Sequence, residues 1–399
     1  MYNIKFCKVC FYKDVNPIPI SFNNKGVCTG CLYSLKKDKV DWNQREQNFI
    51  DLIKNYKNKY EYDCVLPVGG GKDSYFAAHI AKKYDLKALM VSYYSNRYLD
   101  EGKYNLFRMK ELFGFDHIIY TPPEKTLIKM HRIGLKKMGD QNMHNHMGID
   151  TYPNIIAVQK KIPLIIWGEQ GFTEMGGMHS INDFVEYTKK YRLEHAQHGY
   201  DWYDFENITD EHLLKKDLEC YIYPEENLTR EINLRGIYLS NYFYYDGNHN
   251  YKISKEKYGW KEKEKAFERT YRTFSNVDDM HENGVHDYLK FIKFGYGRGT
   301  DHANYDVRLN KISREDGIKL VLKYDHVTPV EDLTNWCKYV SMEEDEFYFH
   351  ADKFRDPRVW SKKEGYWWKI DVDGKLRPYQ KIATTNKFNH IKNYADIRS

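Results

Sequence analysis

Residues 69–74 read Gly69-Gly70-Gly71-Lys72-Asp73-Ser74, with an apolar run before them and an amphipathic segment after them. The run 64–68 is typical of a buried strand, and residues 75–84 have the spacing of a helix. The order strand, glycine turn, helix directs free backbone N–H groups and the positive end of the helix at an anion, most often phosphate. We therefore expect a phosphate-binding loop here, although a tight turn without a ligand would use glycine equally well.

The spacing of this loop excludes two common phosphate motifs. A Walker A loop needs Gly-x-x-x-x-Gly-Lys-Ser/Thr, but Leu66 stands in place of its first glycine and Asp73 follows the lysine. A dinucleotide fingerprint starting at Gly69 would need a third glycine where Ser74 stands. The loop resembles instead the Ser-Gly-Gly-x-Asp-Ser loop of ATP pyrophosphatases (the PP-loop), which split ATP between the α and β phosphates. Gly69 replaces the first serine of that pattern.

Four of the seven cysteines form two Cys-x-x-Cys pairs near the N-terminus. The pairs are Cys7 with Cys10 and Cys28 with Cys31. Thiolates at this spacing converge on one tetrahedral centre, and the separation of the pairs is typical of a zinc ribbon. A redox pair and an iron–sulfur cluster are the alternatives. The isolated cysteines, which we expect to be ordinary core or surface thiols, are Cys64, Cys220 and Cys337.

Length and composition limit the classes of protein to which this chain can belong. The 399 residues are enough for two or three domains, and 41% hydrophobic residues can fill a sizeable core. The net charge of +5 is a mild excess among 62 basic and 57 acidic residues of interspersed sign, which argues against a dedicated nucleic-acid binder. The sequence has no apolar run long enough to span a membrane, and its first residues lack the apolar core of a signal peptide. We therefore expect a cytoplasmic protein.

From residue 62 onward, short apolar runs alternate with helical segments. This alternation predicts an α/β fold with a doubly wound parallel sheet, a zinc ribbon over residues 1–40, the loop domain over 41–250 and a mostly helical region over 251–399. The expected strands are Cys64–Val68, Ala88–Tyr93, His117–Tyr120, Leu164–Gly168 and Ile237–Tyr242. The expected helices include Tyr75–Tyr84, Tyr104–Phe113, Thr126–Met138 and Tyr152–Lys160.

In such sheets ligands bind beyond the carboxyl ends of the strands. Ser92 and Tyr93, at the end of the second strand, are therefore expected to meet the adenine and ribose of a nucleotide. Glu169, which follows the fourth strand, should border the reaction centre. His144 and His146 lie two residues apart in an expected loop, where they are surface histidines or metal ligands.

A second glycine-rich segment, residues 291–302, reads Phe-Ile-Lys-Phe-Gly-Tyr-Gly-Arg-Gly-Thr-Asp-His. Thr300 or Asp301 is expected to N-cap the helix that continues through Arg308. Arg298 and Arg308 at such a helix suit a carboxylate or phosphate ligand. A helix–helix turn with solvated charges is the competing interpretation.

Taken together, these motifs resemble the N-acetyl sugar amidotransferases, including those proposed to act on pseudaminic and legionaminic acid. The resemblance covers nearly the whole chain. It rests on the paired cysteines, the glycine loop, the segment around His144 and His146, and two longer blocks. The blocks are Ile162-Pro163-Leu164-Ile165-Ile166-Trp167-Gly168-Glu169 and residues 288–302, Tyr-Leu-Lys-Phe-Ile-Lys-Phe-Gly-Tyr-Gly-Arg-Gly-Thr-Asp-His302.

The resemblance implies that AMP is transferred from ATP to the oxygen of a sugar acetamido group and that ammonia then displaces AMP, leaving an acetamidino group. The amides of Gly70, Gly71 and Lys72 would hold pyrophosphate, with help from Ser74, while Asp73 would help place Mg²⁺. The candidate bases are Glu169, His144, His146 and His302. The candidate contacts of an acidic sugar are Arg298, Thr300, Asp301 and Arg308. With no recognisable glutaminase signature, the ammonia is expected from a separate glutaminase or from solution.

Two other functions stay open on the sequence. A tRNA thiolation enzyme also combines a zinc ribbon with a PP-loop, but it needs further catalytic cysteines and a basic surface. A zinc module that binds a nucleotide without turnover would account for the serine missing at Gly69.

Overall fold

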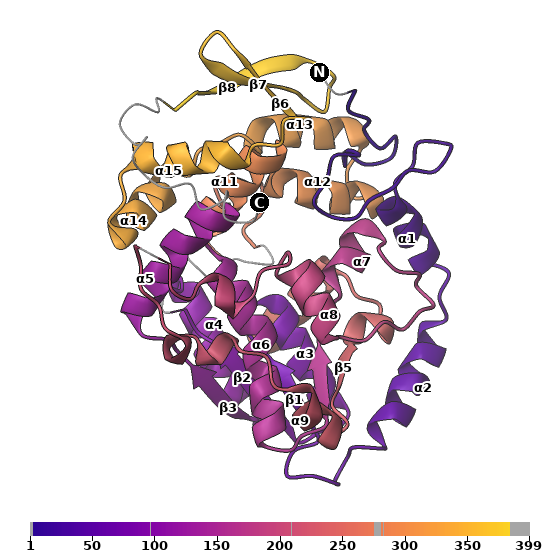
Figure 1. Ribbon diagram of the computed structural model, residues 1–399. Helices are drawn as coiled ribbons and strands as arrows, with labels where there is room; N and C mark the ends of the chain where they lie inside the picture. Colours follow the sequence, from indigo (N-terminus) through magenta and orange to yellow (C-terminus); the bar gives the residue numbers. More distant parts are fainter. Residues whose placement is uncertain (1–2, 96, 209, 275–280, 282, 384–399) are drawn as a thin grey trace.

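The structure, a computed structural model, describes residues 3–383 apart from residues 96, 209, 275–280 and 282. Its centre is a five-stranded sheet in the order β3-β2-β1-β4-β5, in which every neighbouring pair is parallel (Figure 1). The strands are β1 (Cys64–Pro67), β2 (Ala88–Tyr93), β3 (Asp116–Tyr120), β4 (Leu164–Trp167) and β5 (Arg235–Tyr238). The chain winds outward from β1 to one edge and then returns through β4 to the other edge. The α/β fold and the parallel sheet predicted from the sequence are confirmed.

Both faces of the sheet are covered, and the alternation of side chains along β1 shows how. Cys64 and Leu66 enter the core beneath α3, whereas Val65 packs on the opposite face among residues of α6. A strand buried on both faces must be apolar throughout, which is why β1 and β4 read as continuous apolar runs. The helices that form these two layers are α3 (Lys72–Lys83), α4 (Asp100–Phe113), α5 (Glu124–Ile133), α6 (Met143–Gln159) and α10 (Gly247–Tyr258).

The predicted strands agree with the observed ones to within one residue, except at β5. That strand ends at Tyr238 rather than Tyr242, because residues 239–241 turn as a short 3₁₀ helix. The observed helices begin earlier than the predicted ones. The difference is largest for α6, which starts at Met143 instead of Tyr152. The helix α5 continues into a π-helical turn at Gly134–Met138. Shorter helices along this part of the chain are α7 (Gly171–Gly176), α8 (Lys189–Tyr191) and α9 (Glu226–Glu231).

The C-terminal part forms a second layer above the sheet domain in Figure 1. Its helices are α11 (Asn283–Phe294), α12 (Arg298–Arg308), α13 (Arg314–Tyr324), α14 (Val330–Val340) and α15 (Glu344–Ala351). An antiparallel sheet of β6 (Trp360–Lys363), β7 (Tyr366–Ile370) and β8 (Leu376–Lys381) lies on top of them. The region is mostly helical, as expected, but this small sheet was not predicted.

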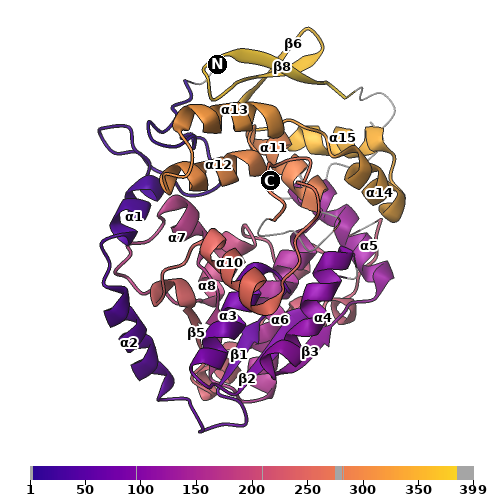
Figure 2. The same ribbon diagram turned by 180° about the vertical axis from the view of Figure 1, so that it is seen from behind.

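The N-terminal segment lies along one side of both layers, with α1 (Thr29–Lys37) and α2 (Trp42–Ile53) running down the sheet domain (Figure 2). The hydroxyl of Tyr12 donates to Asp301 of the upper layer over 2.9 Å. The hydroxyl of Thr29 donates to the carbonyl of Gly176 in α7 over 2.6 Å. Residues 3–40 are therefore held by both layers, and the division of the chain into three domains stays a prediction.

None of the helices in the described part of the chain is long and apolar enough to cross a membrane.

Candidate functional site: a glycine loop, a buried cysteine cluster and the layer between them

The loop after β1 lies where the sheet changes direction, between β1 and its neighbour β4. Such a switch point is where doubly wound sheets bind their ligands. The loop borders a cavity of about 220 Å³. Side chains from four other places complete its wall: Tyr93 of β2, Asn145 of α6, Trp167 of β4 and Asn283 of α11. The glycine loop predicted from the sequence therefore faces an open site.

The conformation of the loop explains its glycines. Gly70 has a φ of +87°, and a Cβ there would lie 2.9 Å from the backbone of Leu106, so only glycine fits. Its carbonyl accepts a hydrogen bond from the indole of Trp260 over 2.9 Å. Gly71 precedes the first residue of α3 and makes no side-chain cap, so the helix N-terminus is open to an anion. The hydroxyl of Ser74 accepts from the backbone N–H of Gly69 over 2.9 Å.

Lys72 and Asp73 form an ion pair at the start of α3. Lys72 is 2% exposed, and its ammonium lies 2.6 Å from the Asp73 carboxylate. The other carboxylate oxygen of Asp73 accepts from the amide of Asn250 in α10 over 2.8 Å. Lys72 is thus a buried charge that does not face solvent. Asp73 remains partly exposed at the cavity.

Glu169 follows β4 and is partly buried. Burial, together with the negative charges of Asp73 and Glu174, raises the pKa of its carboxyl group to about 8. The Lys37 ammonium pairs with Glu174 over 2.6 Å. This pairing neutralises the Glu174 carboxylate locally, whereas Lys37 does not pair with Glu169. A carboxyl group that holds its proton near neutral pH can act as an acid or a base. Its place beside Asp73 fits the position expected for it at the reaction centre.

Ser92 and Tyr93 do not offer their hydroxyls to a nucleotide. The Ser92 hydroxyl donates to the carbonyl of Val68 over 2.6 Å and contacts His117. The Tyr93 hydroxyl lies 2.6 Å from that of Tyr221 and 3.0 Å from Nδ1 of His144. Tyr93 nevertheless lines the loop cavity. The core thus uses both hydroxyls, and contact of Ser92 and Tyr93 with adenine and ribose stays a prediction.

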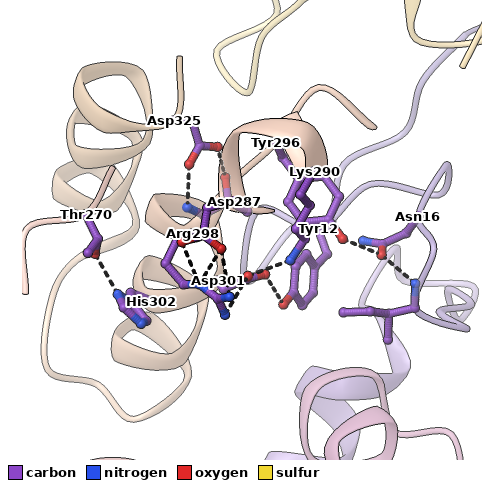
Figure 3. Close-up of polar contacts among 12 residues, drawn as sticks. Tyr12, Asn16, Thr270, Asp287, Lys290, Tyr296, Arg298, Asp301, His302 and Asp325 are labelled. Carbon is purple, nitrogen blue, oxygen red and sulfur yellow. Dashed lines mark hydrogen bonds and ion pairs between the residues drawn. The ribbon is translucent and has the colours of Figure 1, made fainter. Parts of the chain in front are cut away.

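The three histidines proposed as bases lie apart. His144 and His146 are on helix α6, not in a loop, so their side chains point to different sides of the helix. His144 packs edge-on against His131, and His146 lies beside His286. His302, in α12, contacts the hydroxyl of Thr270 over 2.6 Å (Figure 3).

Burial keeps these imidazoles neutral. It lowers the pKa of His146 to about 4 and the pKa values of His144 and His302 well below their ordinary range. None of the three is among the residues that line the loop cavity in the described part of the chain. Glu169 is likewise not among the described residues that line this cavity, but it is the candidate base whose pKa the charge of Asp73 raises.

The second glycine-rich segment forms a buried charge network, drawn in Figure 3. Arg298 binds the carboxylate of Asp287 through Nε over 3.0 Å and through a terminal nitrogen over 2.8 Å. Asp301 accepts from Lys290 over 2.6 Å and from Tyr12 over 2.9 Å. Arg298 also borders a cavity of about 100 Å³, adjacent to the loop cavity through Asn283, which lines both.

The cap predicted for α12 is wrong. The helix begins at Arg298 and its N-cap is Gly297, which has no side chain to donate or accept. A distant residue supplies the cap instead: Asp325, just after α13, accepts from the backbone N–H of Thr300 over 2.8 Å and from its hydroxyl. Thr300 and Asp301 thus lie inside the helix and hold the fold together.

The four cysteines converge in a buried cluster whose ligand atoms all lie within 4.8 Å of one another. The Sγ atoms of Cys7 and Cys31 are 3.9 Å apart, and those of Cys10 and Cys28 are 3.6 Å apart. Four thiolates at 2.3 Å from a tetrahedral zinc ion lie about 3.8 Å from each other. The distances therefore fit a structural zinc site, with no position left open.

Arg308 belongs to this cluster and not to the loop cavity. One of its terminal nitrogens lies 3.6 Å from Sγ of Cys28 and 3.8 Å from Sγ of Cys10, and the other donates to the carbonyl of Met175 over 2.7 Å. Four thiolates around a divalent cation leave two negative charges, which a buried guanidinium offsets. This placement corrects the expectation that Arg308 contacts a sugar.

Sequence reasoning missed several residues of the site. Asn250 and Trp260 hold the loop from a helix and a turn far along the chain, and Asn283 reaches the cavity from the upper layer. Asparagine and tryptophan occur throughout the chain, so no local signal singles these out. The pair Asp140 and His286 was also missed, since 146 residues separate them.

Residues 268–372 match a family model for the C-terminal domain of WbpG-like LPS biosynthesis proteins. The WbpG-like match spans α11 to α15 together with β6 and β7, and it includes Arg298, Thr300 and Asp301. It does not reach the glycine loop or the cysteine cluster. No curated protein matches the chain.

Proposed function

We propose that this protein acts in the biosynthesis of lipopolysaccharide or a related surface sugar, as an ATP-dependent amidotransferase. The observation that carries the proposal is the open glycine loop at the switch point of the sheet, beside Asp73 and Glu169. The WbpG-like match in the layer above supports a sugar as the substrate. The proposed substrate is an acidic N-acetylated sugar such as a nonulosonic acid of the pseudaminic or legionaminic type.

The proposed reaction has two steps. The oxygen of the acetamido group attacks the α phosphorus of ATP, so that an oxygen–phosphorus bond forms and pyrophosphate leaves. Ammonia then attacks the acetamido carbon, AMP leaves, and an acetamidino group remains. The backbone N–H groups of Gly71 and Lys72 and the start of α3 would hold the departing pyrophosphate. Glu169 would take a proton from the incoming ammonium, so that ammonia is the species that attacks.

The carboxylate of Asp73, partly exposed at the cavity, fits a role in holding Mg²⁺. Magnesium is commonly bound by one or two carboxylates together with substrate phosphates, and it offsets their charge. Asn250 and Lys72 fix the carboxylate in place for this purpose. The four cysteines would hold a separate, structural zinc ion.

The remaining cysteines bear on the choice between amide and sulfur chemistry. Cys64, Cys220 and Cys337 are buried in three different core clusters. Burial raises the pKa of Cys220 and of Cys337 to about 12, so neither thiol ionises near neutral pH. Thiolation enzymes need reactive cysteines at the site, and these three do not supply them. They also offer no glutaminase nucleophile, which favours ammonia from a partner enzyme or from solution.

The experiment that tests the proposal supplies ATP, Mg²⁺, a panel of N-acetylated acidic sugars and ¹⁵N-ammonium to the full chain. We expect the label in the acetyl-derived group of one sugar, which gains a basic centre because an amidine is protonated at neutral pH. Glutamine alone should give little product until a glutaminase is added. Sulfur transfer to tRNA would assign the protein to the thiolation enzymes. No labelled product across the panel would favour nucleotide binding without turnover.

A further inference from the structure

A second group of metal-ligating side chains lies apart from the cysteines. It consists of Asp140, at the loop before α6, His146 of α6 and His286 of α11. One ligand atom from each lies within 4.8 Å of the others. Asp140 is buried and the two histidines are partly exposed. Two segments distant in sequence, residues 140–146 and helix α11, thus bring two imidazoles and a carboxylate to one point between the sheet domain and the upper layer.

The geometry of this group suits coordination. Nδ1 of His286 lies 3.2 Å from Oδ1 of Asp140, and the rings of His146 and His286 have centroids 5.4 Å apart. Ligands bound at about 2.0–2.1 Å in a tetrahedral site lie roughly 3.3 Å from each other. The backbone N–H of Asn142 donates to Oδ1 of Asp140 over 2.9 Å, which fixes the carboxylate. Ligating carboxylates commonly carry such a second hydrogen bond.

We propose that Asp140, His146 and His286 bind a divalent first-row transition metal ion, with zinc the ion to test first. Two imidazoles and one carboxylate favour zinc or iron(II) over the all-oxygen ligands that magnesium and calcium prefer. Three protein ligands leave at least one position open, in contrast to the closed cysteine cluster. The open position would take water or an oxygen atom of a small-molecule ligand.

The location of this site connects it to the loop cavity. Asn145 precedes His146 in α6, and Asn283 lies one helical turn before His286 in α11; both asparagines line the cavity. An oxygen-bearing ligand that fills the cavity would therefore have the metal site nearby. The proposal rests on the three ligands alone and stands whether or not the loop binds ATP.

Lys293 and His198 are the competing partners of the carboxylate. Both interact with Asp140, as do His146 and His286. If Lys293 is the counterion of Asp140, no metal is needed and the contact with His286 is a plain hydrogen bond. Metal content distinguishes the two arrangements.

The test is elemental analysis of the full-length protein after expression in zinc-supplemented medium and gel filtration. We expect two zinc ions per chain, one in each site. His286→Gln and His146→Gln should each retain one ion, and the control His249→Gln, which alters an exposed histidine outside both sites, should retain two. One ion per chain in the wild type, lost with Cys28→Ser, would overturn the proposal. So would two ions in all three histidine variants.

A second measurement starts from the wild-type protein, so its first outcome does not depend on how the variants fold. Cobalt(II) is titrated into wild-type protein whose cysteine cluster is already filled with zinc. Binding at Asp140, His146 and His286 should produce ligand-field bands without the charge-transfer band of thiolate ligands. Either histidine variant should weaken this binding by more than about tenfold, since even loss of an outer-shell partner costs 10- to 100-fold. Absence of such bands in the wild type would contradict the proposal.

Discussion

Asp73 connects the loop to the helices around it. One of its carboxylate oxygens is paired with the buried ammonium of Lys72, and the other accepts from Asn250. It also lies at the N-terminal end of α3, where a negative charge is stabilised by the free N–H groups. The same carboxylate is thus part of the fold and the proposed magnesium ligand. A substitution there affects both stability and activity, and the two effects must be measured separately.

Asp73→Asn should reduce AMP formation by at least about 100-fold, comparable to the loss of a transition-state contact at other charge-stabilising sites. It should also lower the free energy of unfolding by about 1–3 kcal/mol, because the buried Lys72 loses its charged partner. Steady-state AMP release and chemical denaturation measure the two effects. Ser74→Ala, the matched control within the loop, should cost only about tenfold in rate. Wild-type turnover in Asp73→Asn would place the nucleotide elsewhere.

Glu169 gives a pH dependence with a definite sign. Its pKa is about 8, above the ordinary value of 4.5, so the folded protein favours the protonated form. If the ionised carboxylate is the base, kcat/KM should rise as the pH increases through about 8. Glu169→Gln should remove this rise and most of the activity. A wild-type profile that is flat from pH 6 to about 9 would rule out this role.

The same group should affect stability. The folded state holds the Glu169 proton up to about pH 8, whereas the unfolded chain releases it near 4.5. The contribution of Glu169 to stability is therefore full below 4.5 and declines as the pH rises to about 8, by at most about 1.4 kcal/mol per pH unit. Denaturation of wild type and Glu169→Gln at several pH values measures the difference.

Individual side-chain roles could be predicted only where they depend on neighbours in sequence. The loop glycines and the four cysteines were identified because their spacing alone defines the motif. The cap of α12 could not be found, since Asp325 reaches Thr300 from 25 residues away. Arg308 likewise contacts cysteines some 280 residues earlier in the chain. Long-range ion pairs leave no periodic signal in a sequence.

At the scale of elements, the approach of α6 to β2 shapes the loop cavity. Gly148 lies against the ring of Tyr93, and a Cβ at Gly148 would come within 2.3 Å of that ring. The glycine is thus required by the close contact of helix and strand, not by its backbone angle. Tyr93 and the α6 residue Asn145 both border the cavity.

Gly148→Ala should therefore push α6 away from the sheet and destabilise the protein by about 1–3 kcal/mol, the range typical of overpacking. Thermal unfolding measures the loss. Gly171→Ala, where an added Cβ meets nothing within 4 Å, is the matched control and should change stability much less. Equal stability of Gly148→Ala and wild type would show that the helix can shift without cost.

The composition of α6 explains why its first residues were predicted to be a loop. It is buried on several sides, so its apolar residues do not follow one stripe, and Pro153 interrupts the pattern from within. The β6–β8 sheet was missed because its strands are short and rich in charged residues, with exposed positions along them. The central strands, in contrast, were predicted well, because burial on both faces makes them apolar throughout.

The cysteine cluster holds α1 against the rest of the protein. Cys28 caps α1 by accepting from the backbone N–H of Cys31, and Arg308 of α12 contacts the cluster from the upper layer. Cys28→Ser should therefore lose the zinc ion and lower the melting temperature by several degrees, more than Cys337→Ser, which removes an isolated buried thiol. Elemental analysis and thermal unfolding measure the two effects. Iron, or no metal, in the wild type would reject a zinc site.

At the scale of the whole molecule, the loop cavity lies where the two layers meet. The sheet domain supplies the glycine loop, and α11 of the upper layer supplies Asn283, which also borders the smaller cavity beside Arg298. The WbpG-like match falls on the upper layer alone. This division is consistent with the proposed enzyme, in which the sheet domain would activate a nucleotide and the upper layer would select a sugar.

The central claim is that the glycine loop cleaves ATP between the α and β phosphates. The most direct measurement is to identify the nucleotide products by ³¹P NMR when the full chain is incubated with ATP, Mg²⁺, ammonium and the sugar panel. The account predicts AMP and pyrophosphate, formed only with a productive sugar and lost in Asp73→Asn. Sugar-dependent formation of ADP and phosphate would contradict it.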